Sequence, residues 1–212
     1  MLEVRALELL CSRLCHDLVS PIGAINNGVE LMEEMGREMM TDAMALVSQS
    51  GHRAAALLRL FRLAYGAAGA QPSFGLAETR EVAEAYMAAT KTELNWQVGP
   101  AEPADTLPPG TAKTLLNALV LAEETLTHGG TITVSVDGGG QPGSIAITAS
   151  GRVASLSDEA AAALAGRTPA EELTPRSVHA YATGLFARHY NIPLTLDQDG
   201  EGQLKVTLRL PF

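Results

Sequence analysis

The 212-residue sequence has few cysteines, few basic residues and no long apolar run. Its two cysteines, expected to be reduced and partly buried, suit the cytosol. Lysine and arginine total 15 against 24 acidic residues, and the net charge of −9 disfavours nucleic acid and acidic membrane surfaces as direct partners. No apolar run reaches the roughly 18 residues of a membrane span, and no charged stretch with a cleavage site precedes the first patterned segment. We therefore expect a cytoplasmic protein with no membrane contact.

Apolar residues recur every three or four positions through the first 32 residues, at Leu7, Leu10, Leu14, Leu18, Ile22, Ile25, Val29 and Met32. This spacing predicts an amphipathic helix. At roughly 100° per residue, His16 lies opposite the apolar stripe. Five other residues share its outward face: Ser12, Ser20, Gly23, Asn27 and Glu34. His16 is therefore expected to point at water or at a partner.

A histidine on a polar helix face is by default an ordinary surface residue, but the neighbours of His16 favour a chemical role. Asp17 follows directly, and its carboxylate can hold the imidazole tautomer or accept a proton when the other ring nitrogen attacks an electrophile. Pro21 bends the helix one turn further on. Gly23 leaves the face open, although glycine is unfavourable inside a helix. These residues make His16 and Asp17 the candidate catalytic pair.

A second helical stripe follows a turn predicted after Gly36, with Ala43, Met44, Val47, Ala54, Leu57, Leu58, Phe61 and Tyr65. Antiparallel pairing of the two helices places residues near position 60 beside His16. Arg59 and Arg62 are thus candidates to attract an acidic partner surface or a phosphoryl group, the alternative being a solvated helix face. His52 is a rival nucleophile, but it lacks the flanking carboxylate and the proline.

Two helices alone leave much apolar surface uncovered, so the hairpin of residues 1–66 is expected to form a dimeric four-helix bundle with a second copy. A metal site at Cys11, Cys15 and His16 is not favoured. His16 points about 100° away from Cys15 around the helix, and no second cluster of ligands follows in the sequence.

Residues 67–76 are rich in glycine, alanine and proline and predict a linker, after which a second domain is expected over 77–212. Its pattern predicts a helix, a strand, a long helix over 109–127, strands over 131–136 and 144–150, two helices, and final strands over 192–197 and 203–210. One sheet covered by helices, an α+β sandwich, is the simplest packing. Gly138–Gly143 predicts a hairpin turn, because it lacks the Lys and Ser/Thr of a phosphate loop. The remaining histidines, His128, His179 and His189, are expected to be structural or solvated.

The order His, acidic, Leu, two residues, Pro resembles the phosphoacceptor box of sensor histidine kinases. The whole run HDLVSPIGAINNGVEL, starting at His16, is more similar to ChpT-type bacterial histidine phosphotransferases. This resemblance implies a dimeric four-helix bundle in which His16 takes a phosphoryl group from one receiver-domain aspartate and passes it to another. It also implies that Asp17 assists the ring, and that the docking face includes Ser20, Gly23 and Asn27.

The second domain resembles the ATP-binding (Bergerat) domain of histidine kinases, but its nucleotide motifs are damaged. Asn117 matches the first of two asparagines in the kinase motif, whereas Leu121 stands where the magnesium ligand belongs, and a leucine cannot coordinate magnesium. Ala149 replaces the aspartate that binds adenine, and only Gly151 remains of the following glycines. The glycine-rich lid is replaced by PRSVHAYATGLFARHY, in which a helix is expected to start from Thr174 and Pro175.

The resemblance implies a phosphorelay histidine phosphotransferase with no cofactor of its own, because the Mg²⁺ belongs to the receiver domain. Its expected partners are the receiver domains of a hybrid histidine kinase and of response regulators, together with a second copy of the chain. Two alternatives stay open. One is an active histidine kinase with a divergent ATP site, and the other is a non-catalytic dimeric scaffold that binds receivers without becoming phosphorylated.

Overall fold

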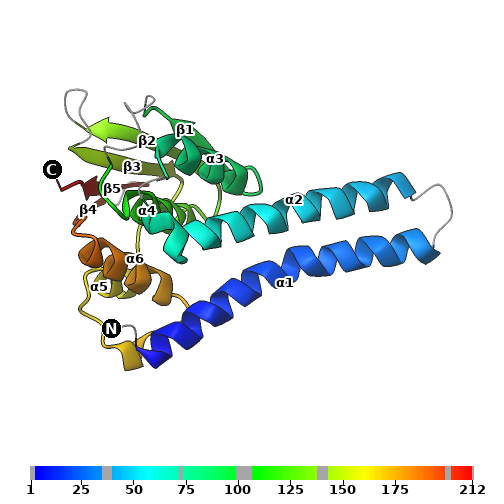
Figure 1. Cartoon of the computed structure of the whole chain (residues 1–212), viewed down its shortest axis with the longest axis horizontal. Helices are drawn as coiled ribbons and strands as arrows, with labels where there is room; N and C mark the ends of the chain where they lie inside the picture. Colours follow the sequence, from blue (N-terminus) through cyan, green and yellow to red (C-terminus); the bar gives the residue numbers. More distant parts are fainter. Residues whose placement is uncertain are drawn as a thin grey trace.

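The computed structural model describes residues 3–34, 40–71, 74–98, 107–137, 143–198 and 202–211. Two long antiparallel helices, α1 (Val4–Glu34) and α2 (Met40–Ala64), form an arm that projects from an α/β body (Figure 1). The arm is the predicted hairpin. Its predicted turn near residue 38 lies outside the described residues.

The two helices of the arm approach closely where Gly28 of α1 is buried against α2. A Cβ atom built on Gly28 would lie 2.6 Å from Cγ2 of Val47 and 3.2 Å from the carbonyl oxygen of Ala43. Pro21, inside α1, is also buried. Part of the predicted apolar stripe faces outward instead, since Leu7, Ile22 and Val29 are 49%, 47% and 43% exposed in the single chain. The arm alone therefore leaves apolar surface uncovered.

The body contains one mixed sheet of five strands in the order β1-β2-β3-β5-β4. Its strands are β1 (Thr92–Trp96), β2 (Gly130–Asp137), β3 (Ser144–Gly151), β4 (Leu194–Gln198) and β5 (Gln203–Arg209). Only β1 and β2 pair in parallel. Along β5, Leu204, Val206 and Leu208 are fully buried and alternate with less buried residues, which is the pattern of a strand covered on one face.

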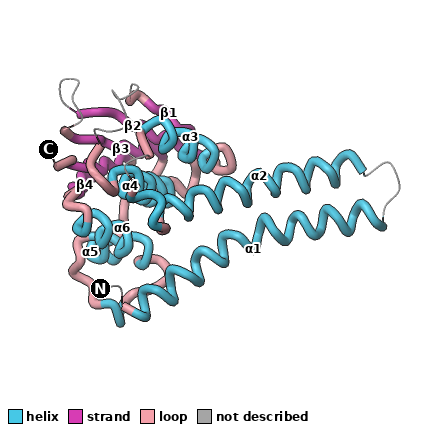
Figure 2. Tube along the Cα trace, in the orientation of Figure 1, coloured by secondary structure: helices cyan, strands magenta, loops and turns pink. Residues whose placement is uncertain are grey.

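The helices of the body lie between this sheet and the arm (Figure 2). They are α3 (Leu76–Met87), α4 (Thr111–Glu124), α5 (Asp158–Leu164) and α6 (Val178–His189), with 3₁₀ turns η1 (Ala67–Ala70) and η3 (Ala170–Glu172). The α+β sandwich expected from the sequence is confirmed. The predicted turn at Gly138–Gly143 joins β2 and β3, which pair antiparallel, but residues 138–142 lie outside the described part of the chain.

One helix start differs from the prediction. The helix expected from Thr174 and Pro175 begins at Val178. The Thr174 hydroxyl donates to Oε1 of Glu159 at 2.6 Å and accepts from the backbone N–H of Arg176 at 3.2 Å. These bonds hold residues 174–177 as a turn, because a threonine hydroxyl that bonds nearby backbone competes with the helical hydrogen-bond pattern.

The end of α2 is buried in the body and shares its core. Leu60 and Leu63 belong to the same apolar cluster as Leu115 and Leu119 of α4. Two residues of the segment 67–76, expected to be a linker, contact this core as well: Ala68 packs against the cluster and Leu76 is buried within it. The arm and the body are therefore built on one continuous core.

Two polar side chains of α4 bind the last carbonyl groups of α2. Lys113 Nζ lies 2.7 Å from the carbonyl oxygen of Gly66 and 3.3 Å from that of Ala64, and Asn117 Nδ2 lies 2.7 Å from the Ala64 oxygen. Helix C-termini leave carbonyl groups without partners inside the helix, and a cation there is favourable. Burial lowers the pKa of Lys113 to about 8. Both side chains thus fasten the arm to the body.

Replacing Asn117 with alanine should destabilise the fold by about 1–3 kcal/mol, because a buried hydrogen bond between the domains is lost. Urea unfolding of wild type and variant measures the effect. Arg80→Ala is the control, since it removes only a surface ion pair with Glu84 that contributes less than about 1 kcal/mol. If the two variants unfolded at the same urea concentration, the bond of Asn117 to α2 would contribute nothing to stability.

Candidate functional site

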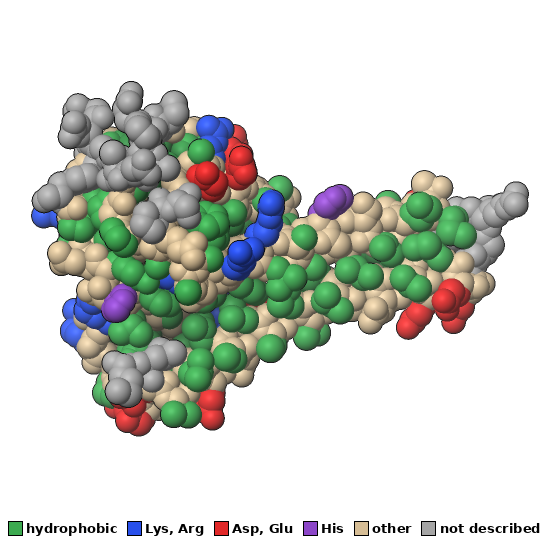
Figure 3. Space-filling view, in the orientation of Figure 1, with side chains coloured by type: hydrophobic (Ala, Val, Ile, Leu, Met, Phe, Trp, Pro, Cys, Tyr) green, Lys and Arg blue, Asp and Glu red, His purple; other side chains and the backbone are tan. Residues whose placement is uncertain are grey.

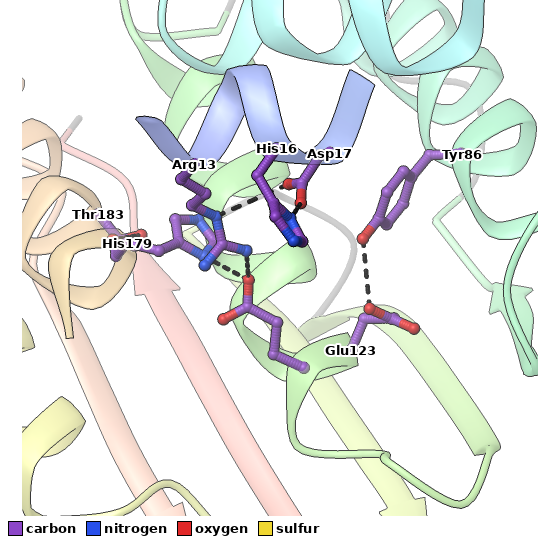
Figure 4. A network of polar contacts seen from close by, with 8 residues as sticks. Arg13, His16, Asp17, Tyr86, Glu123, His179 and Thr183 are labelled. Atoms are coloured by element: carbon purple, nitrogen blue, oxygen red, sulfur yellow. Dashed lines mark hydrogen bonds and ion pairs between the residues drawn. The ribbon is translucent and has the colours of Figure 1, made fainter. Parts of the chain in front are cut away.

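His16 lies in the middle of α1 with its side chain 89% exposed. Its Nδ1 atom is 3.3 Å from Oδ1 of Asp17, and the two side chains lie together in Figure 4. His16 is exposed as the sequence predicts and lies away from the buried residues Leu10 and Pro21, although Leu10 is the one member of the predicted apolar stripe that is buried in the single chain. One ring nitrogen faces a carboxylate, and the ring as a whole is open to solvent.

A cavity of about 570 Å³ separates the arm from the body at this level. His16, Asp17 and Ser20 line it from α1, and Arg53 lines it from α2. The body contributes residues from the end of α3, the following loop and the end of α4, among them Tyr86, Lys91 and Glu123. His16 thus stands at a recess that two parts of the chain build together.

The residues predicted to bind a partner are only partly gathered here. Ser12, Ser20 and Asn27 are exposed along α1 as expected, and a Cβ at Gly23 would meet nothing within 4 Å. Of these, only Ser20 lines the cavity. The roles of these residues in binding stay predictions.

Arg59 and Arg62 are exposed but do not line the cavity, whereas Arg53 does. The partner-binding role of Arg59 and Arg62 stays a prediction. The predicted pairing of the two helices gives only the position along α2 that lies level with His16. The direction in which a side chain points depends also on its angle around the helix. Arg59 is two residues beyond Leu57, which lines the cavity, and so points about 200° away from it.

A row of charged side chains links the surroundings of His16 to the body (Figure 4). Arg13 Nε lies 4.0 Å from Oδ2 of Asp17, and the Arg13 guanidinium donates a close hydrogen bond to Oε1 of Glu124 at the end of α4. The same Glu124 oxygen is 2.9 Å from Nδ1 of His179 on α6. His179 is fully buried, and its Nε2 has no hydrogen-bond partner among the described residues. This agrees with the structural role expected for His179.

A second, partly buried pair of polar side chains borders the cavity. The Tyr86 hydroxyl lies 3.2 Å from Oε2 of Glu123. Burial, and secondarily the nearby Glu123 carboxylate, raises the pKa of Tyr86 above its ordinary range. Burial also raises the pKa of Glu123. The tyrosine therefore stays protonated and serves as a hydrogen-bond donor at neutral pH.

The three positions that the sequence comparison matched to a kinase nucleotide site carry side chains that are buried within the protein. Leu121 is 2% exposed and packs in a cluster with Leu173 and Val178. Ala149 is fully buried in the sheet core. The Asn117 amide donates to the carbonyl oxygens of Ala64 and Lys113. Asn117 thus contacts the end of α2, Leu121 packs in a cluster with residues of α6, and Ala149 is part of the sheet core.

Several alternatives considered from the sequence find no support in the described residues. Cys11 and Cys15 are free and exposed, where partial burial was expected, and no group of three or more metal-binding side chains occurs in the described ranges. His52 is exposed on α2 but does not line the cavity of His16. No helix in the described part of the chain is long and apolar enough to cross a membrane.

The Glu124 carboxylate is expected to stabilise the fold at neutral pH and to lose this contribution in acid. Burial raises its pKa, but His179 and Arg13 outweigh burial and bring the pKa below its ordinary value of 4.5. Because the folded-state pKa is the lower one, the contribution is complete above the ordinary value and is lost as pH falls through the folded-state value. The difference in unfolding free energy between wild type and Glu124→Gln should therefore narrow below about pH 4.5. Urea unfolding as a function of pH measures this difference in unfolding free energy. If the difference stayed constant from neutral to acidic pH, the charged Glu124 carboxylate would not stabilise the fold.

Comparisons with known proteins agree with this arrangement. Residues 76–202 match the family described as histidine phosphotransferase C-terminal domain. Protein phosphotransferase ChpT of Brucella abortus (strain 2308) is 35% identical over 194 residues, which cover 91% of this chain and 90% of the relative. A solved structure of a bacterial phosphotransferase superposes with a TM-score of 0.82 at 33% identity, covering 99% of this chain and 98% of that one. The sequence match, the fold and the exposed histidine agree, and the chain belongs to the histidine phosphotransferase family.

Proposed function

We propose that His16 carries the phosphoryl group in a phosphorelay, taking it from the aspartate of one receiver domain and giving it to the aspartate of another. The observation that carries this proposal is an imidazole that is 89% exposed, paired with Asp17 and placed at a recess. A nucleophile that serves two protein partners has to be reachable by both. Membership in the histidine phosphotransferase family supports the class of reaction.

In the forward step, the lone pair of Nε2 of His16 attacks the phosphorus atom of the aspartyl phosphate. The N–P bond forms as the bond to the aspartate oxygen breaks, and the electron pair leaves with the receiver carboxylate. Asp17 holds the proton on Nδ1, which fixes the tautomer and stabilises the positive charge that develops on the ring. Such transfer depends chiefly on in-line positioning and charge neutralisation. The Mg²⁺ that assists it is assigned to the receiver domain.

The proposed docking face for the receiver runs along α1 beside His16. It comprises Ser12, Ser20, Gly23 and Asn27, to which the structure adds Arg53 across the recess. The open space above Gly23 allows a partner to approach the helix closely. Arg53 is placed to attract the acidic phosphorylation site of a receiver or the phosphoryl group itself.

Two findings weigh against the kinase alternative. The leucine at position 121 is packed in the core and offers no ligand for magnesium. The asparagine that remains is engaged with α2. We therefore propose that the chain receives phosphate from a protein and has no autokinase activity. The scaffold alternative is separated from transfer by the experiment below. We also place the protein in the cytoplasm, where exposed Cys11 and Cys15 stay reduced.

We propose further that the arms of two chains pair as a four-helix bundle. Apolar side chains gather along the arm in Figure 3. The large exposed ones on α1 and α2 are Val4, Leu7, Val19, Ile22, Val29, Met40, Met44 and Leu58. They come from both helices, as a seam against a second hairpin requires. His16 lies outside this group and stays open in such a dimer.

Replacing His16 with alanine should abolish acceptance of phosphate from a phosphorylated receiver domain, because the nucleophile is gone. The purified full chain is incubated with a labelled phospho-receiver, and separately with labelled ATP. We expect label on wild type from the receiver only, none on His16→Ala, and wild-type labelling on the control His52→Ala. Label from ATP alone would indicate a kinase, and absence of label from either source would indicate a scaffold.

Replacing Ile22 with glutamate should shift the protein from dimer to monomer, because a charge would be buried in the seam. Light scattering should give twice the 22.2 kDa of one chain for wild type and the single mass for the variant. Val153→Glu is the matched control, since Val153 is 52% exposed but lies on the body. A wild-type protein of single mass would contradict the dimer.

A further inference from the structure

Two carboxylates lie near Arg13, those of Asp17 and Glu124. Arg13 makes its closer contact with Glu124, which is far from it in the sequence. Arg13 and Asp17 are one helical turn apart, a spacing at which opposite charges on a helix normally pair. Yet Nε of Arg13 stays 4.0 Å from Oδ2 of Asp17, at the outer limit of an ion pair, while the guanidinium makes its close contact with Glu124. Glu124 therefore competes successfully for Arg13.

Glu124 is itself held from the interior of the body. Nδ1 of His179 lies 2.9 Å from the Oε1 atom that also receives Arg13. His179 is fully buried on α6 and cannot swing away without disturbing the core. The net lowering of the Glu124 pKa below its ordinary value keeps this carboxylate charged at neutral pH, despite the opposing effect of burial. The second domain thus presents a fixed negative charge to Arg13.

We propose that Glu124 is a positioning residue that draws Arg13 away from Asp17 and so leaves the Asp17 carboxylate to hold Nδ1 of His16. The inference rests on the proposed function, in which Nε2 of His16 is the attacking atom. If Arg13 paired fully with Asp17, the carboxylate would be shared between a guanidinium and an imidazole. A bidentate guanidinium would engage both carboxylate oxygens, including the Oδ1 that faces His16, and its permanent charge would favour it over the imidazole. The His16 ring would then lose the contact that fixes its tautomer.

Other charged and titratable groups face His16 across the cavity, namely Arg53 from α2 and Tyr86, Lys91 and Glu123 from the body. Glu123 offers a matched comparison, because it precedes Glu124 on the same helix and lines the same cavity. Its contact is with the Tyr86 hydroxyl rather than with Arg13. Removal of the Glu123 charge should therefore leave the ring of His16 in its original state.

The state of the ring is measured by ¹⁵N NMR of the full-length protein at alkaline pH, where an imidazole is neutral. His16→Gln assigns the signals. We expect the Nδ1–H tautomer of His16 to predominate in wild type and in Glu123→Gln. In Glu124→Gln its fraction should fall toward the Nε2–H form that a free imidazole favours in water, and transfer from a phospho-receiver should slow roughly tenfold. An unchanged tautomer in Glu124→Gln would overturn the proposal.

The route through Arg13 is tested by combining variants. In an Arg13→Gln background, Asp17 has no competing guanidinium, so the further change Glu124→Gln should alter neither the tautomer nor the transfer rate. If Glu124→Gln altered the tautomer and the transfer rate equally with and without Arg13, Glu124 would act by another route and the proposal would be overturned. If Glu124→Gln fails to fold, Glu124→Asp replaces it, because the shorter carboxylate releases Arg13 while keeping the charge. The NMR measurement is independent of transfer, so failure of the proposed function at His16 would be recognised separately from failure of this positioning role.

Discussion

The arm is held to the body by the burial of the last turns of α2, and the site depends on that contact. Leu60 and Leu63 enter the core of the body, and Lys113 and Asn117 bind the carbonyl groups at the end of the helix. With α2 fixed, α1 is fixed by its packing along α2 and by the bond from Arg13 to Glu124. The recess at His16 exists because these contacts set the distance between arm and body.

The body belongs to a histidine phosphotransferase, and the residues compared in the sequence with a kinase nucleotide site take part in its packing. Asn117 holds α2, Leu121 fills the contact of α4 with α6, and Ala149 is buried in the sheet core. The Asn117 amide nitrogen is satisfied within the protein, and Leu121 and Ala149 present only apolar groups, so the amide nitrogen and these two side chains need no ligand to be buried.

The sequence predicted the parts of this structure that local periodicity determines. Helical spacing gave both arm helices and the outward direction of His16, and strand patterns gave the sheet. It missed the row from Arg13 through Glu124 to His179, because these contacts join residues 111 and 55 positions apart. It also did not single out Arg53, which lines the cavity of His16 where Arg59 and Arg62 do not, because register alone does not give the angle around α2. The helix expected from Thr174 starts later, since the threonine hydroxyl bonds outside the helix.

The exposure of the His16 ring has a consequence for how partners use it. In the proposed relay, a single imidazole that projects from one helix face offers one atom to both donor and acceptor, so the two receiver domains would exclude each other at that ring. Transfer would then follow a ping-pong order, in which the first partner departs before the second arrives. An abundant unphosphorylated receiver would act as a competitor of the donor, and the relative concentrations of the partners would govern the rate at which phosphate passes through the chain.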